Sequence, residues 1–231
     1  LIVDDVMPLN MRVHYLALAG ADLTNVKAST FSWTTGIGNL GITGVGFQPD
    51  FLLFASAITN AAAMPGLGSD SSGWSVGMAV SSTQQGVWQG NNDDGSITID
   101  TDQYCFDGEC ISTVRFAGEA DVLGRAALVT MDTDGFTINK IESDSIARNI
   151  MYVALKGGSY KVDSLLTQTN TTTDIAETGF GFQPVAALFM SHGLAKSTVD
   201  RTQAGNNISI GAFDSITSRG AQGMNDVDAV A

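Results

Sequence analysis

Charged side chains are scarce in this sequence, and basic side chains are the scarcest. Only 15% of the 231 residues are charged, whereas about 25% is usual in soluble domains. Eleven Lys and Arg residues stand against 24 Asp and Glu residues, which gives a formal net charge of −13. Because nucleic-acid affinity depends on cationic side chains that neutralise phosphates, we expect no nucleic-acid partner.

Cysteine is almost absent. Cys105 and Cys110 are the only two, and they enclose an Asp-Gly step. A turn there would bring two strands together, so a cross-strand disulfide and two free buried thiols both stay open. A zinc site needs about four ligands, and neither His14 nor His192 stands in ligand spacing to the cysteines. We therefore expect no zinc site.

Long apolar runs are also missing. The longest, residues 51–64, is interrupted by Ser56, Thr59 and Asn60, and it is shorter than the roughly 20 residues that span a bilayer. The first residues lack a basic region ahead of an apolar stretch, so they do not resemble a signal peptide. We expect no membrane insertion.

What the sequence has is β-strand patterning with abundant glycine. It contains 26 Gly, only 4 Pro and 44% hydrophobic residues, a composition that suits short strands joined by tight turns. The apolar pattern predicts strands at residues 13–18, 51–54, 74–80, 126–131, 136–141 and 151–155.

Two features refine the prediction of strands. An Asp-Gly step within residues 132–135 predicts a hairpin turn. Residues 51–54 and 185–190 are apolar without alternation, so we expect both faces of that strand to be covered, one by the core and one by another sheet or a partner chain. The predicted fold class is all-β, as a jelly-roll-like sandwich.

The sequence also repeats itself. Residues 43–49, T-G-V-G-F-Q-P, return as residues 178–184, T-G-F-G-F-Q-P. In the same order, residues 15–20 return as residues 152–157, residues 75–77 (S-V-G) return as residues 209–211 (S-I-G), and Gly86 returns as Gly220. Blocks that recur in order at a nearly constant spacing indicate a duplicated folding unit of domain size.

The repeat divides the chain into three parts. Residues 1–20 match the C-terminal strands of a unit, residues 21–157 form one complete β-sandwich unit (the first unit), and residues 158–231 match the N-terminal half of another (the second unit). We expect tandem sandwich domains related by internal duplication. We also expect that the natural protein is longer at both ends, or that neighbouring subunits complete the half-units.

Two motifs resemble catalytic or cofactor signatures. Residues 73–77 fit G-x-S-x-G, a nucleophile elbow that requires a following helix, but the residues after Ser75 are strand-like. Residues 36–41 fit G-x-G-x-x-G, a dinucleotide-binding turn with the same requirement, and their counterparts in the second unit are not glycines. We expect a structural strand at the first motif and a flexible loop at the second. No catalytic residue, cofactor-binding residue or cofactor is predicted.

Acidic pairs recur at Asp93-Asp94, Asp100 with Asp102, Asp132 with Asp134, and Asp226 with Asp228. Such carboxylates are favoured in turns and are also calcium ligands. The turn role is our expectation, no metal site is assigned, and the calcium alternative stays open.

Tryptophan offers another alternative. Trp33, Trp74 and Trp88 are the only three. Stacking on a sugar and packing in a core or interface are both possible roles for them, and we expect the packing role.

The motif order resembles a domain of structural proteins from tailed bacteriophages. The resemblance covers the whole repeat: the T-G-x-G-F-Q-P block and the S-[V/I]-G strand match its start, and residues 131–139 and 147–158 match its end. It implies a virion component, on the capsid surface or associated with the tail or its fibres. Homo-oligomers and other virion proteins are then the expected partners, and no enzyme activity is implied.

A glycan-binding module and a glycosidase are two alternatives to a virion structural protein. A host-surface glycan-binding module would gain avidity from linked copies. A glycosidase would need two carboxylates roughly 5–9.5 Å apart in a groove, whereas the acidic pairs here stand beside turn residues. We expect a structural protein and keep the glycan-binding module as the alternative.

Overall fold

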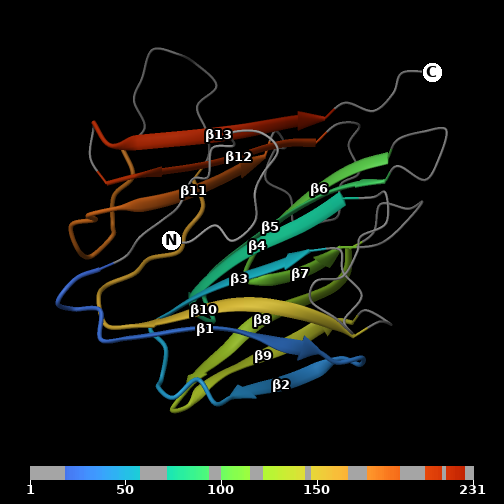
Figure 1. Ribbon diagram of the computed structural model, residues 1–231, viewed down its shortest axis with the longest axis horizontal. Helices are drawn as coiled ribbons and strands as arrows, with labels where there is room; N and C mark the ends of the chain where they lie inside the picture. Colours follow the sequence, from blue (N-terminus) through green and yellow to red (C-terminus); the bar gives the residue numbers. More distant parts are fainter. Residues whose placement is uncertain are drawn as a thin grey trace, which may run out of the picture.

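The computed structural model describes residues 19–57, 72–93, 100–114, 122–143, 147–165, 176–192, 206–214 and 217–226. Every helix-or-strand element in these ranges is a β-strand (Figure 1). The strands are β1 (Asn25–Trp33), β2 (Gly38–Thr43), β3 (Phe51–Ala57), β4 (Ser72–Ser81), β5 (Gln84–Asp93), β6 (Asp100–Asp107), β7 (Ile111–Val114), β8 (Val122–Asp132), β9 (Gly135–Glu142), β10 (Arg148–Lys156), β11 (Ala187–His192), β12 (Asn206–Phe213) and β13 (Arg219–Asp226).

The strands form three antiparallel sheets. A six-stranded sheet has the order β1-β10-β3-β4-β5-β6, a four-stranded sheet has the order β2-β9-β8-β7, and a three-stranded sheet has the order β11-β12-β13. The predicted all-β class is therefore confirmed. No helix in the described residues is long and apolar enough to cross a bilayer.

The main core lies between the six-stranded and four-stranded sheets. Alternate residues of β3 are buried, and they pack against β8, β9 and β10 in one cluster. Phe136 is its aromatic centre, with ring centroids 6.0 Å from Phe31, 5.5 Å from Phe54 and 5.4 Å from Tyr152. Edge-to-face pairs of this kind contribute about 0.5–1.5 kcal/mol each beyond the burial of area.

A buried glutamine also joins these two sheets. The Oε1 of Gln85 in β5 accepts a hydrogen bond of 2.6 Å from the backbone N–H of Leu128 in β8. The pairing of β8 with β9 shifts register between Leu128 and Thr130. Gln85 therefore satisfies a buried donor beside an irregularity in the ladder, as buried backbone groups require.

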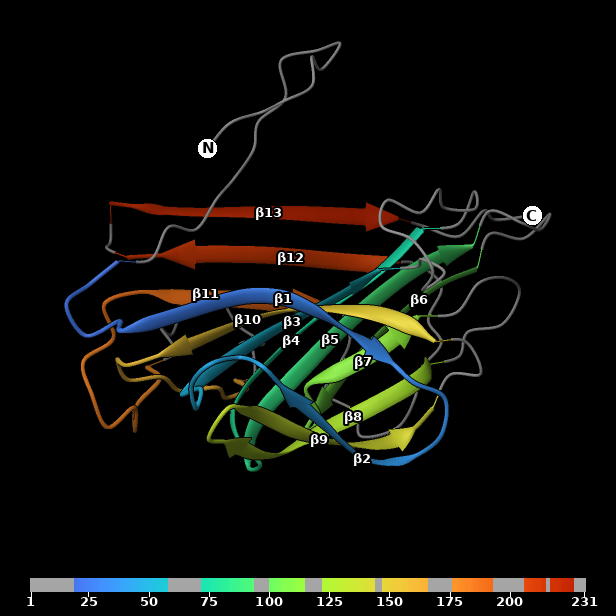
Figure 2. The ribbon, with the colours of Figure 1, turned by 60° about the horizontal axis from the view of Figure 1, so that its bottom comes forward.

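The three-stranded sheet lies on the other side of the six-stranded sheet (Figure 2). Its β12 contacts β5 and β6, and Ile208 in β12 is buried. The six-stranded sheet is thus the middle layer of three.

Most of the predicted strands are confirmed. Residues 51–54, 74–80, 126–131, 136–141 and 151–155 all lie in strands, and Thr133 and Asp134 form the turn of the β8–β9 hairpin. The strand predicted at residues 13–18 lies outside the described residues.

The expectation that β3 and its counterpart are covered on both faces, one by the core and one by another sheet or a partner chain, stays a prediction. In β3 one face is buried and the other is only half-buried. In the second copy the strand begins at Ala187 rather than at Val185, whose side chain is 82% exposed.

Candidate functional site

Ser75, the serine of the G-x-S-x-G motif, is a buried structural residue in the middle of β4. Its Oγ lies 2.7 Å from the Oγ of Ser56 in β3. Both hydroxyl groups lie within hydrogen-bond distance of the carbonyl oxygen of Ser112 in β7, at 2.7 and 2.9 Å. The partners of Ser75 are a second hydroxyl and a carbonyl, neither of which is a general base. The strand predicted for this motif is confirmed.

The G-x-G-x-x-G motif forms a turn and a strand. Gly36 and Gly38 have φ values of 98° and 100°, which side chains rarely adopt, and β2 begins at Gly38. The expected flexible loop was therefore wrong for residues 38–41, which pair with β9. Because a strand follows the glycines, no helix N-terminus faces this turn.

The repeated T-G-x-G-F-Q-P block of the first unit binds the β8–β9 hairpin turn. Gly44 and Gly46 have φ values of 80° and 91°, and their N–H groups donate to the two carboxylate oxygens of Asp134 at 3.1 and 2.6 Å. The side-chain amide of Gln48 donates to the carbonyl oxygen of Met131 at 2.7 Å. The block is thus a backbone cradle for a carboxylate.

The other carboxylate of this turn is held in place by hydroxyl groups. Asp132 accepts hydrogen bonds of 2.7 Å from both Thr137 and Thr130. These bonds, that of Thr137 first, hold the pKa of Asp132 below its ordinary value of 3.8. The expected turn role is therefore confirmed for Asp132 and Asp134.

For the remaining acidic pairs, the side-chain positions lie outside what the structure describes. Asp94 and Asp228 lie outside the described residues, and Asp93, Asp100, Asp102 and Asp226 are placed only as strand positions, without a description of their side chains. Within the described ranges, no three His, Cys, Asp or Glu side chains gather in a geometry that could hold a metal ion.

The two cysteines do not lie on paired strands. The Asp107-Gly108 turn does not connect two paired strands, because β6 belongs to the six-stranded sheet and β7 to the four-stranded sheet. Cys105 is half-buried in β6, and Cys110 is buried in the core just before β7. Neither cysteine forms a disulfide, and burial raises the pKa of the Cys110 thiol well above its ordinary value. The predicted approach of two paired strands was wrong.

Two of the three tryptophans are buried, and the third, Trp74, is half-buried. Trp33 is fully buried in the main core, where the ammonium of Lys140 lies 5.7 Å from its ring centroid. Trp88 is also buried, and its ring lies 4.7 Å from that of Trp74 in a T-shaped contact. Neither Trp33 nor Trp88 offers a free face to a sugar.

The three-stranded sheet repeats the strand register of the first unit. Phe54 pairs with Gly77 between β3 and β4, and Phe189 pairs with Gly211 between β11 and β12. The pairing of Gly86 with Met78 likewise corresponds to that of Gly220 with Ala212.

A side-chain contact is repeated together with the register. Ser56 pairs with Ser75, and Ser191 pairs with Ser209. The two hydroxyl oxygens are 2.7 Å apart in the first pair and 2.6 Å apart in the second. At the positions that the sequence repeat aligns, β11, β12 and β13 therefore pair in the same register as β3, β4 and β5.

The face that is buried in the first unit is open in the second. We call the side of the three-stranded sheet that carries Ala187, Phe189, Ser191, Ser209, Gly211 and Phe213 its core face, because the equivalent positions of β3 and β4 point into the main core. Phe54 is 1% exposed, whereas its counterpart Phe189 is 43% exposed. Phe213, stacked on Phe189 at 5.5 Å, is 39% exposed.

A pair of equivalent glycines shows the same difference. A Cβ on Gly77 would meet the carbonyl oxygen of Cys110 at 1.8 Å, so β4 needs glycine where the chain enters β7. On Gly211 the nearest atom would be the Cβ of Ala221 at 3.4 Å, an ordinary contact distance. Gly211 therefore occupies the position of Gly77, but no described residue lies against it as Cys110 lies against Gly77.

The second T-G-x-G-F-Q-P block also keeps the cradle conformation. Gly179 and Gly181 have φ values of 79° and 76°, close to those of Gly44 and Gly46. At all four glycines, nothing among the described residues lies within 4 Å of an added Cβ.

Sequence reasoning found the repeat but missed what the repeat builds, because the partner of the cradle is 90 residues away in the chain. Our comparisons add no relative: no protein-family model, no curated protein and no solved structure matches this chain.

Proposed function

We propose that the chain is a structural assembly protein of a virion, built from tandem β-sandwich units and located on the capsid surface or in the tail or its fibres. Its role is to form contacts with other copies of itself and with other virion proteins. Catalysis has no part in this proposal, and neither does a cofactor.

The observation that carries the proposal is the open core face of the second unit. Phe189 and Phe213 are exposed at positions that the first unit buries, and Gly211 stands where the first unit needs room for a covering segment. Contiguous exposed apolar patches mark interaction sites, and Phe189 and Phe213 are stacked on each other. The second unit keeps the strand register of the first unit and the positive φ values of its glycine block, and its exposed core face offers a surface to a partner.

The motif order supports the assignment to a virion. It resembles tailed-phage structural proteins along the complete first unit, from the T-G-x-G-F-Q-P block to residues 147–158. The motifs that resemble enzyme signatures support a scaffold instead, since Ser75 is locked in a hydrogen bond between strands.

Mass spectrometry of purified particles tests this function. Particles from a culture that produces the chain are banded in a density gradient and washed with concentrated salt, and the chain is then quantified against the major capsid protein. The expected result is a fixed ratio that survives the wash. As a control, free chain added to particles that lack it should wash away. A chain that is absent from the particles and monomeric in solution contradicts the proposal.

The glycan-binding alternative has less support. It needs aromatic faces that stack on sugar rings, and Trp33 and Trp88 are buried. No observation on the described residues favours it.

A further inference from the structure

We propose that the free edge of β11 binds residues 11–18 of a second copy of this chain as an added antiparallel strand, so that copies join head to tail. The inference rests on the proposed assembly function and names the partner and the register of one contact. Adding a strand to an exposed edge is a common mode of protein recognition, in which backbone hydrogen bonds supply the affinity.

The edge of β11 is the observation that prompts the proposal. In the first unit, β3 lies between β10 and β4. Its counterpart β11 pairs with β12, and among the described residues no strand pairs with its other edge. Unpaired N–H and C=O groups along a strand with apolar neighbours favour pairing with another chain.

Residues 11–18 are the segment of this chain whose sequence fits that edge. They read M-R-V-H-Y-L-A-L, and they align with residues 148–155, R-N-I-M-Y-V-A-L, which are β10 itself. Tyr, Ala and the last Leu are identical, and Val13 and Leu16 replace Ile150 and Val153. A segment with the side chains of β10 is therefore suited to the counterpart of β3.

The first unit fixes the register. Tyr152 pairs with Phe54, and Ala154 pairs with Leu52. Transferred to the second unit, Tyr15 stands opposite Phe189 and Ala17 stands opposite Ala187.

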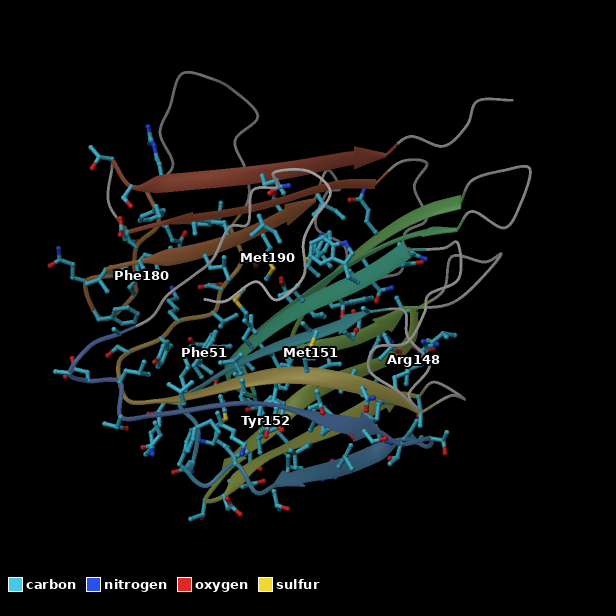
Figure 3. The ribbon with its side chains drawn as sticks, viewed as in Figure 1. Phe51, Arg148, Met151, Tyr152, Phe180 and Met190 are labelled. Atoms are coloured by element: carbon cyan, nitrogen blue, oxygen red, sulfur yellow. The ribbon has the colours of Figure 1, made fainter. Side chains whose placement is uncertain are left out.

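The transferred register also fixes the faces. Tyr152 is buried in the main core, 5.4 Å from Phe136, so Tyr15 would cover the exposed Phe189 from the core face. Met190, on the opposite side of β11, lies toward the six-stranded sheet, as Figure 3 shows. The added strand therefore has one defined register, since a slip by one residue would turn every side chain to the wrong face.

The order of the chain favours a second copy over the same molecule. In the first unit, β10 is followed directly by the start of the second unit. Residues 11–18 are likewise followed directly by the first unit of their own molecule. If residues 11–18 pair with β11 of another copy, the second unit of that copy is followed in space by the first unit of the molecule that donates the strand. Inside each chain, one unit likewise follows another.

This contact joins different surfaces on the two copies, so it is heterologous and builds a ring or an open filament. Charge favours it as well. Residues 11–18 carry Arg12 and His14 and no acidic residue, whereas the whole chain carries a formal charge of −13. A cationic strand is attracted to an acidic body.

Disulfide trapping between two single-cysteine variants tests the proposal. Both variants carry Cys105→Ser and retain Cys110, which is buried in the core, so each has a single cysteine outside the core. One also carries Ala17→Cys and the other Ala187→Cys. Directly opposed residues in antiparallel strands have Cα atoms about 4.5–5.5 Å apart, within the range that a disulfide spans. The matched control replaces Ala187→Cys by Leu188→Cys, which points to the other face.

The expected result is a covalent dimer when the Ala17→Cys and Ala187→Cys proteins are mixed and oxidised, and its loss with Leu188→Cys. A trap that forms only when both cysteines are in one molecule overturns the claim for a second copy. If the mixed variants form oligomers but no disulfide links residue 17 to residue 187, this contact is overturned and the assembly function still stands. A protein that stays monomeric at every concentration contradicts both.

A second measurement uses the unmodified chain. A synthetic peptide of residues 9–20 competes for β11, so oligomers of the wild-type protein should be lost as the peptide is added. A scrambled peptide of the same composition should have no effect. Equal effects of the two peptides would overturn the proposal.

Discussion

Replacing Gly77 by Ala should destabilise the protein strongly, whereas the same change at Gly211 should be nearly silent. The two glycines occupy equivalent positions in β4 and β12, opposite Phe54 and Phe189. They differ in what a methyl group would meet. At Gly77 it would overlap the carbonyl oxygen of Cys110 at 1.8 Å and the carbonyl carbon at 2.7 Å.

The structure gives the magnitude of the effect. The overlapping atoms belong to the backbone, and the N–H of Cys110 is bonded to the carbonyl oxygen of Ala126 at 2.9 Å, so the segment cannot move without losing packing and a buried bond. Overpacking costs about 1–3 kcal/mol and sometimes more, and we place Gly77→Ala at about 3 kcal/mol. With about 3 °C per kcal/mol for a domain of this size, its Tm should fall by roughly 9 °C.

Gly211→Ala is the matched control. Its methyl group would meet the Cβ of Ala221 at 3.4 Å, and the free energy of unfolding should change by less than about 0.5 kcal/mol, as for most surface substitutions. Urea unfolding followed by circular dichroism, together with calorimetry, measures both variants. Equal losses would refute the reasoning that only the first unit has a covered core face, and so would a silent Gly77→Ala.

Three further outcomes follow from the same structure. Asp134→Ala removes the carboxylate that holds two backbone N–H groups and should cost about 1–2 kcal/mol in urea unfolding; an unchanged midpoint would contradict the cradle. Because Thr137 helps to hold the pKa of Asp132 below 3.8, the stability from this carboxylate is complete above that pH and is lost as the pH falls through the lowered pKa. Thr137→Val should therefore flatten the acid limb of a stability–pH curve, and an unaltered limb would count against the assignment. In native protein a thiol reagent should label Cys105 well before Cys110, which is buried and has a raised pKa; labelling of both at one rate would show that the core is open.

Much of the fold could be predicted from local pattern. The β8–β9 hairpin forms contacts between residues that are close in the chain. The pattern of residues 126–141 was therefore enough to predict two strands joined by a turn. The sequence repeat aligns Phe189 with Phe54 and Gly211 with Gly77, and in both sheets the phenylalanine pairs with the glycine.

The missed elements depend on partners far away in the chain. β1 is a mostly exposed, polar strand, and β10 alone holds it in the sheet, by pairing with Asn25 through Trp33. β5 contains two Gly and two Asn residues, which disfavour strands on their own, yet it is paired on both sides by β4 and β6. The chain changes sheets after Asp107, and a turn sequence does not specify which sheet the next strand joins.

The binding partner of the glycine cradle could not be predicted for the same reason. Gly44 and Gly46 were visible as part of a repeated block, but the carboxylate of Asp134 comes from a hairpin about 90 residues later. Likewise, Phe189 looks like a core residue in the sequence. Only the three-dimensional arrangement shows that its face is open.

The central claim is that the open second unit makes this chain assemble, and sedimentation equilibrium of the intact chain tests it most directly. Over a wide concentration range, the account predicts a weight-average mass that rises above that of one chain as concentration increases. A mass that equals one chain at every concentration would contradict it.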